Sequence, residues 1–135
     1  MPYLKPLPSI DSDSKTYWDG CKKHELLVPW CKHCKQNFFP PRPLCPDCLS
    51  PDLEWRKASG KGTVYSLSVV HQNRSSGFRE EGPYVLAYVT LAEGVQMLSN
   101  VVHKDPYEVK IGMAVELFFE DATPEISIPK FKLAA

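Results

Sequence analysis

Four cysteines in two close pairs constrain this chain more than any other feature. Cys31 and Cys34 are separated by two residues, as are Cys45 and Cys48, and ten residues lie between the pairs. Each pair can form a tight turn that aims two thiolates at one point, and four thiolates complete a tetrahedral metal shell. Such a shell leaves no position for water, so we predict a structural zinc site. Iron in the same shell would make a rubredoxin-like electron carrier, and sulfur geometry alone does not separate the two metals.

The remaining cysteine, Cys21, makes the total odd, which favours a reducing compartment and a metal site over disulfides. His33 lies inside the first cysteine turn, where we expect a solvated neighbour of the metal because four thiols are already available. Many such turns have glycine after the second cysteine, whereas this chain has Lys35 and Leu49. We therefore expect less regular turns with all four ligands kept.

The segment before the cysteines divides into an arm and a helix. Residues 1–9 hold Pro2, Pro6 and Pro8, a composition that favours an extended arm. From Asp11 to about His24 we predict a short helix with Asp11 or Asp13 as its N-cap. Its apolar face packs either on this chain or on a partner, and the pattern leaves both open; that face comprises Ile10, Tyr17, Trp18 and Cys21.

The rest of the chain is predicted to form β-strands. Segments 26–30 and 53–57 frame the cysteine pairs, as in zinc ribbons. Beyond the hinge at Gly60 and Gly62 the alternation predicts further strands, ending in one that includes Ile126 and Ile128. Because closure removes exposed sheet edges, we expect a mainly β protein whose N-terminal helix and four-cysteine zinc ribbon precede a five-stranded OB-fold barrel. The expected divisions are 1–25 (arm and helix), 26–59 (zinc ribbon) and 60–135 (OB-fold domain).

Charge and hydropathy bear on location and on partners. No segment approaches the roughly 18 apolar residues of a membrane span, and the first residues lack the apolar stretch of a secretory signal, so we expect a cytoplasmic protein with no membrane partner. Residues 1–61 hold 10 basic and 7 acidic side chains, whereas residues 62–135 hold 6 basic and 9 acidic. Nucleic-acid binding needs a basic face, so the acidic barrel half argues against it.

Catalytic motifs are missing from the sequence. It has no Gly-x-Ser-x-Gly, no glycine-rich phosphate loop and no His-Glu-x-x-His. Cys21 and His24 are three residues apart and are a weak candidate for a nucleophile and base, because lone helical cysteines are usually buried apolar residues. His71 and His103 lie at strand ends, where we expect loop hydrogen bonds. We therefore predict no catalytic residues, and a protein that is not an enzyme by itself.

The order of several motifs is more specific than any one of them. Tyr17-Trp18-Asp19-Gly20 precedes the first cysteine pair, and Phe39-Pro40-Pro41-Arg42 links the two pairs. A Gly62-Thr63-Val64-Tyr65 entry to the barrel and an Ile111-Gly112-Met113 segment follow. Together they cover nearly the whole chain, which resembles the OB-fold family known as domain of unknown function 35.

The resemblance implies an N-terminal helix, a rubredoxin-like zinc ribbon and an OB domain. It also implies a non-catalytic subunit of a thiolase or thiolase-like retro-aldolase complex in acyl-CoA metabolism, one that helps to assemble the complex and to shape the coenzyme A or acyl-CoA site. The catalytic residues would then lie on the thiolase-like partner. The acyl group, the direction of the carbon–carbon bond chemistry and the stoichiometry are left open.

Two surfaces are candidates for these contacts. For the partner interface we select aromatic and apolar residues of the arm and helix, because such side chains anchor interfaces: Tyr3, Leu4, Tyr17 and Trp18. For coenzyme A we select Arg74, Phe78 and Arg79 in the long loop 71–83, since arginine suits phosphate. Glu80 and Glu81 follow directly, so a solvated surface is the competing interpretation. A stand-alone coenzyme A binding protein is the alternative function, and a nucleic-acid-binding OB or zinc-ribbon protein is a weaker one.

Overall fold

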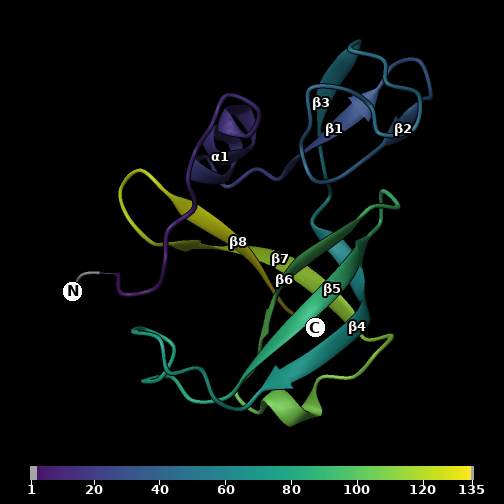
Figure 1. Cartoon of the computed structure of the whole chain (residues 1–135). Coiled ribbons are helices and arrows are strands. Elements are labelled where there is room, and N and C mark those ends of the chain that lie inside the picture. Colours follow the sequence, from purple (N-terminus) through teal and green to yellow (C-terminus); the bar gives the residue numbers. More distant parts are fainter. Residues whose placement is uncertain (1–2, 135) are drawn as a thin grey trace.

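The fold was determined as a computed structural model, which describes residues 3–134. Met1 and Pro2 of the expected arm, and the last residue of the expected OB domain, lie outside the described residues. The structure confirms the expected class: one α-helix, a small sheet that carries the cysteines, and a closed five-stranded barrel (Figure 1). The only α-helix within residues 3–134 has eight residues, so no helix in that range can cross a membrane.

The N-terminal helix is shorter than the sequence predicted. It runs from Lys15 to Lys22 (α1), with Ser14 and not Asp11 or Asp13 at the N-cap. The Asp11 carboxylate accepts hydrogen bonds from the backbone and hydroxyl of Ser14, which closes a separate turn before the helix. At the other end His24 adopts a φ of 61°, and the Glu25 N–H donates to Gly20 O at 2.8 Å. A left-handed residue of this kind ends helices.

The helix packs on its own chain through part of its predicted apolar face. Tyr17 and Cys21 are buried in the same apolar cluster as the barrel residues. Trp18 packs partly buried against that cluster, whereas Ile10 precedes the helix and is exposed. The structure therefore places half of the predicted apolar face in the core.

The small sheet has three antiparallel strands in the order β2-β1-β3. These are β1 (Leu27–Cys31), β2 (Gln36–Asn37) and β3 (Leu53–Lys57), so β1 lies one residue from its predicted position and β3 lies where it was predicted. Arg56 on β3 stacks over the Trp30 ring of β1 at 3.7 Å. Figure 1 shows this sheet beside α1, above one end of the barrel.

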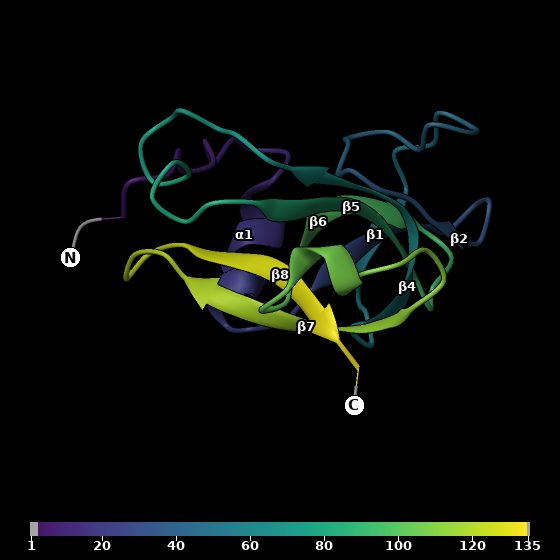
Figure 2. The same ribbon diagram turned by 90° about the horizontal axis from the view of Figure 1, so that it is seen from below.

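The barrel is formed by β4 (Lys61–Val70), β5 (Tyr84–Leu91), β6 (Gln96–Val102), β7 (Ala114–Asp121) and β8 (Ser127–Leu133). Their order around the barrel is β4-β5-β6-β8-β7, closed by antiparallel pairing of β4 with β7, and only β6 and β8 are parallel. A 3-10 turn, η1 (Pro106–Glu108), precedes β7. Figure 2 looks at the barrel from below and shows β7 and β8 along one side.

Gly62, the second residue of β4, lies too close to the paired strand for any side chain. A Cβ at this position would lie 2.7 Å from the Thr90 carbonyl oxygen and 2.8 Å from the Val89 side chain on the paired strand β5. Because backbone atoms of a paired strand cannot give way cheaply, only glycine fits. The Gly-x-Gly entry to the barrel therefore has a packing reason.

Candidate functional site

The two cysteine pairs lie on two matching turns. Cys31 ends β1, and the Lys35 N–H donates to the Cys31 carbonyl at 2.7 Å. In the second turn the Leu49 N–H donates to the Cys45 carbonyl at 2.8 Å. Backbone hydrogen bonds thus fold both Cys-x2-Cys segments in the same way, with their thiols on the inner side of each turn.

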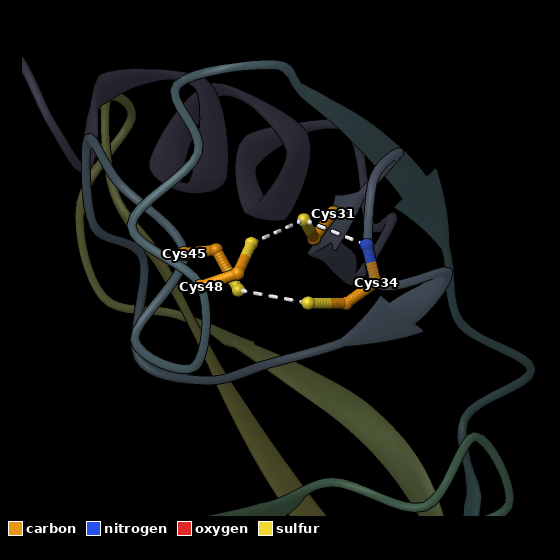
Figure 3. A group of neighbouring side chains, drawn as sticks. All are labelled: Cys31, Cys34, Cys45 and Cys48. Carbon is orange, nitrogen blue, oxygen red and sulfur yellow. Dashed lines mark hydrogen bonds between the residues drawn. The ribbon is translucent and has the colours of Figure 1, made fainter.

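The four sulfurs form one compact cluster, in which the side chains point toward one another (Figure 3). The Sγ atoms of Cys31 and Cys48 are 3.6 Å apart, those of Cys34 and Cys45 are 4.0 Å apart, and all four lie within 4.8 Å of one another. Tetrahedral zinc with Zn–S distances of about 2.3 Å requires sulfurs about 3.8 Å apart. The four-cysteine cluster therefore fits a structural zinc ion.

The residue after each cysteine pair adopts a left-handed backbone. Lys35 has a φ of 58° and Leu49 a φ of 63°. This is the conformation for which glycine is the usual residue, and it costs a residue with a side chain about 1–2 kcal/mol. The turns therefore keep the regular geometry even without glycine, and a bound metal would offset the strain.

The electrostatics of the cluster explain why it needs a cation. Burial opposes ionisation of Cys45, but the backbone N–H groups of Cys48 and Asp47 lower its pKa to about 7. The pKa of Cys34 is raised to about 12, chiefly by its contact with Cys48 and by burial. Four thiolates this close repel one another unless a metal neutralises them. A divalent ion held by these four cysteines would supply that charge and keep all four deprotonated.

Cys21 and His24 are engaged outside the cluster. Burial raises the pKa of Cys21 to about 12, and the thiol is fully enclosed in the core. His24 faces away from it, with Nε2 2.8 Å from Asp121 Oδ1 and its ring stacked on Phe119. His33 is exposed. Cys21 and His24 thus form no nucleophile and base pair.

The loop histidines make hydrogen bonds at the strand ends. His71 Nδ1 lies 2.8 Å from the Tyr107 hydroxyl, and His103 Nε2 lies 3.3 Å from a Glu108 carboxylate oxygen. These contacts join the β4–β5 loop (residues 71–83) and the end of β6 to η1. They give both histidines a local structural role.

The loop residues selected for coenzyme A lie together. Arg74, Phe78 and Arg79 line one open pocket of about 260 Å³. The guanidinium of Arg79 pairs with Glu80 at 3.1 Å, and Glu81 pairs with the distant Lys5 at 2.8 Å. Both glutamates are therefore neutralised, which leaves Arg74 as the net positive charge of this loop.

The four residues selected for a partner interface differ in exposure. Leu4 is 56% exposed, whereas Tyr17 is 5% exposed and offers almost no contact area. Tyr3 is half-buried and donates a hydrogen bond to Glu120 at 2.9 Å. Trp18 is half-buried and packs edge-on against Tyr17. Only Leu4 and Trp18 of this set present apolar surface.

An apolar groove beside Trp18 was not predicted. It measures about 430 Å³ and lies between α1, the link joining the two cysteine pairs, and the β5–β6 face. Its lining includes no charged side chain among the described residues: Ser14, Tyr17, Trp18, Phe39, Pro40, Pro41, Leu86, Met97, Leu98, Ser99, Asn100, Ile128 and Pro129. The sequence held a signal, because segment 84–91 is apolar on both of its faces.

A buried charge network was also missed. The Lys130 side chain is 8% exposed, and its ammonium donates to Glu120 at 3.0 Å. Burial alone would raise the pKa of Glu120, but the hydrogen bonds from Lys130 and Tyr3 outweigh it and hold that pKa below its ordinary value. Burial and the bond to Glu120 raise the pKa of Tyr3. A lysine between the apolar neighbours Pro129 and Phe131 was the available signal.

Comparison with known families gives two adjoining matches. Residues 18–54 match the model described as the ChsH2 rubredoxin-like zinc ribbon domain. Residues 55–120 match the model described as the ChsH2 C-terminal OB-fold domain. The zinc ribbon match and the four-sulfur cluster together support a structural zinc.

Three curated relatives have related descriptions. The chain is 38% identical over 131 residues to the probable enoyl-CoA hydratase alpha subunit of Thermomonospora curvata, covering 97% of this chain but 40% of that protein. It is 42% identical to a DUF35 domain-containing scaffold protein of Methanocaldococcus jannaschii, over 76% and 73% of the two chains. It is 31% identical to the benzoylsuccinyl-CoA thiolase subunit BbsA of Geobacter metallireducens, over 78% and 72%. The chain thus spans less than half of the hydratase subunit.

A solved structure matches along nearly the whole chain. The structure described as the Ltp2-ChsH2(DUF35) aldolase contains a chain that superimposes with a TM-score of 0.86 at 36% identity. The match covers 96% of this chain and 100% of that chain. Helix, ribbon and barrel are therefore arranged similarly in both.

Proposed function

The chain belongs to the ChsH2, or DUF35, family of zinc-ribbon OB-fold proteins, and from that premise we propose that it is a non-catalytic subunit of a thiolase or thiolase-like retro-aldolase complex of acyl-CoA metabolism. The observation that carries the proposal is the full-length likeness to one chain of an aldolase assembly. A thiolase subunit among the relatives points to the same class of partner. In this role the chain helps to assemble the complex and to shape the site for coenzyme A.

Partner contact is assigned to the arm and helix, with Leu4 and Trp18 as the main anchors. Leu4 is exposed, and Trp18 borders the uncharged groove. Large apolar side chains at such positions are typical anchors of protein interfaces. Tyr3 and Tyr17 belong to the same surface as supports, since one is hydrogen-bonded to the barrel and the other is buried beneath Trp18.

Zinc would act as a brace in this role. The Phe39-Pro40-Pro41 segment between the two cysteine pairs forms one wall of the groove beside Trp18. Holding Cys31, Cys34, Cys45 and Cys48 on one ion fixes the ends of that segment. The metal site is thus connected to the proposed partner surface through the chain itself.

Co-purification tests the partner role. Tagged protein should purify in a stoichiometric complex with a chain of the thiolase fold from the same cells, identified by mass spectrometry and then purified. Leu4→Ala and Trp18→Ala should each weaken binding of that purified subunit by about tenfold. Ile111→Ala is the matched control, since Ile111 is an exposed apolar residue of the β6–β7 loop. A well-behaved lone monomer with no thiolase-fold companion would overturn the proposal.

The ligand half of the proposal assigns Arg74, Phe78 and Arg79 to coenzyme A. Arginine side chains suit its phosphate groups, and the Phe78 ring offers an apolar wall in the same pocket. Calorimetry with coenzyme A on the complex should show affinity reduced about tenfold by Arg74→Ala. Arg42→Ala in the ribbon is the control. Equal affinities for both variants and the wild type would remove Arg74 from the site. Binding of coenzyme A by the isolated chain, with no partner needed, would favour the stand-alone alternative.

A further inference from the structure

The described part of the arm begins with three residues that differ in their contacts. The Tyr3 hydroxyl donates to Glu120 of β7, and the Lys5 ammonium lies 2.8 Å from Glu81 of the β4–β5 loop. Leu4 between them is exposed. Tyr3 and Lys5 are thus held by side-chain contacts with this protein, whereas Leu4 keeps most of its surface accessible beside Glu80 and Glu81. Figures 1 and 2 both show the arm beside this loop.

Lys5 lies tightly against the loop. Its side chain is 12% exposed, and its ammonium lies 5.2 Å from the centre of the Phe78 ring, a cation–π contact in addition to the ion pair. At Gly77, a Cβ would lie 2.8 Å from both the backbone nitrogen and the Cγ of Lys5. Glycine at position 77 is therefore what lets the arm approach the loop so closely.

A small cavity lies under this contact. It measures about 140 Å³, and its lining includes Lys5, Phe78, Asn100 and Lys130. Lys130 is paired with Glu120, which also accepts the hydrogen bond from Tyr3. The arm thus touches both the loop and the Glu120–Lys130 pair, and Phe78 of the loop and Lys130 both line the cavity.

We infer that Tyr3, Leu4 and Lys5 form a clasp that holds the β4–β5 loop closed over the cavity beside Lys130. The clasp and the loop are ordered together, because each supplies the other's contacts. Leu4 remains exposed beside the loop, so a partner that binds Leu4 stabilises the closed loop, and by linkage a ligand held by the loop strengthens partner binding. This coupling rests on the proposed function, whereas the clasp itself does not.

Two glycines of the same loop provide a matched test from the loop side. Gly77 and Gly82 both have positive φ, 88° and 78°, but a Cβ at Gly82 would meet nothing within 4 Å. Gly77→Ala and Gly82→Ala therefore introduce similar backbone strain, and only the first displaces the arm. Backbone NMR order parameters of Leu4 and Lys5 should fall from about 0.85 to below 0.6 in Gly77→Ala and remain high in Gly82→Ala.

The converse test changes the arm and observes the loop. Tyr3→Phe combined with Lys5→Ala removes both polar contacts of the clasp. Hydrogen exchange of loop amides with internal partners, such as those of Gly77, Phe78 and Glu81, should accelerate about tenfold. The control Lys15→Ala removes an exposed ion pair with Asp19 on α1 and should leave loop exchange unchanged. This test holds even if Gly77→Ala fails to fold.

Unchanged loop exchange in the arm variant would overturn the clasp, as would arm order parameters that fall equally in both glycine variants. Both measurements use the chain without partner or ligand, so they are independent of the proposed function. With the purified thiolase-fold subunit, Leu4 contact should slow loop exchange in the wild type. Partner binding with no change in loop exchange would overturn the coupling while leaving the subunit role intact.

Discussion

Around its four cysteines the ribbon buries very few side chains, whereas the barrel is filled with them. Between residues 31 and 53 the buried apolar residues are Cys31, Phe38 and Cys45, two of which are metal ligands in our assignment. The barrel core instead comprises Val64, Val85, Ala87, Val89, Leu91, Val95, Met97, Val101, Val109, Val115 and Phe131. We therefore expect the tip of the ribbon to depend on metal for its stability, and the barrel to depend on apolar burial.

The base of the ribbon, like the barrel, is stabilised by apolar burial. Leu26 and Val28 are buried in the same cluster as Tyr17 and Cys21 of the helix and as the barrel side chains. The boundary between the two modes of stabilisation thus runs through β1, between Val28 and Cys31. The expected division of the chain at residues 25 and 59 remains a prediction, and stability experiments can locate it.

Removing one metal ligand gives the largest expected difference between the two regions. Cys45→Ser opens the four-sulfur shell, and structural zinc binding is worth about 10–16 kcal/mol in zinc-finger peptides at neutral pH. We expect zinc content and partner binding to fall together, with loss of dispersed amide NMR signals from residues 31–53 while barrel signals persist. Cys21→Ser is the control that keeps zinc. A zinc-free variant still fully bound to its partner would refute the brace.

The tryptophans offer a simple optical form of this experiment. Trp18, Trp30 and Trp55 all lie outside the barrel strands, on the helix and the ribbon. Tryptophan fluorescence therefore reports the helix and ribbon, and far-UV circular dichroism is dominated by the larger barrel. As a chelator removes zinc, the tryptophan fluorescence should change at a lower chelator concentration than the far-UV circular dichroism.

A core truncation should affect the barrel most. Phe131 is 0% exposed and is paired with Val101 of β6 and Leu117 of β7, so it lies in the core where β8 joins these two strands. Phe131→Ala should lower the free energy of unfolding by about 3–5 kcal/mol in urea, followed by circular dichroism in zinc-containing buffer. Ile111→Ala on the surface should change it by less than about 0.5 kcal/mol. A loss below 1 kcal/mol for Phe131→Ala would show that the barrel is not held by this core.

A substitution of Cys21 tests where the boundary between the metal-stabilised and the burial-stabilised regions lies, and its expected effect on stability is smaller. Its thiol is enclosed and its pKa is raised to about 12, so a thiol reagent at pH 8 should modify it only after unfolding. Cys21→Ser should cost about 1–2 kcal/mol, because it buries a more polar group. Zinc content, measured by mass spectrometry, should not change. Loss of zinc from this variant would show that the helix belongs to the region that is stabilised by the metal.

Much of the fold was predictable because its signals are local. The spacing of Cys31, Cys34, Cys45 and Cys48 identified the ribbon, and the strand predicted over residues 53–57 has the observed bounds of β3. The predicted start of α1 was wrong by several residues. The Asp11 carboxylate accepts a hydrogen bond from the Ser14 N–H, which forms a separate turn before the helix begins at Lys15. Such a choice between two neighbouring caps depends on tertiary packing of the helix.

Functional residues were predictable only where they lie close together in the sequence. The cysteines are close in sequence and were found, but Tyr3 meets Glu120 across 117 residues. That contact depends on barrel closure, which brings β7 beside the arm and buries Lys130 of β8. No local pattern around Tyr3 specifies a partner so far along the chain.

The smallest expected effect is the pH dependence of stability that is due to Glu120. It tests the charge network of the barrel independently of the metal site in the ribbon. Its folded-state pKa lies below the ordinary value of 4.5. Its carboxylate therefore contributes stability that is full above about pH 4.5 and is lost as the pH falls through the lower folded-state pKa. The Glu120 side chain is 34% exposed, so solvent screening limits this contribution to about 1 kcal/mol.

The measurement is urea unfolding from pH 6 to pH 3, followed by circular dichroism in Cys45→Ser protein, so that zinc release makes no contribution. Tyr3→Phe removes one of the two hydrogen bonds that lower the Glu120 pKa and should make the acid loss of stability smaller. Tyr65→Phe, at an exposed tyrosine of β4, should leave that loss unchanged. If Tyr3→Phe and Tyr65→Phe have the same acid profile, the arm does not reach the barrel charge network in solution. A smaller loss in Tyr3→Phe alone would show that the arm stabilises the barrel independently of the metal.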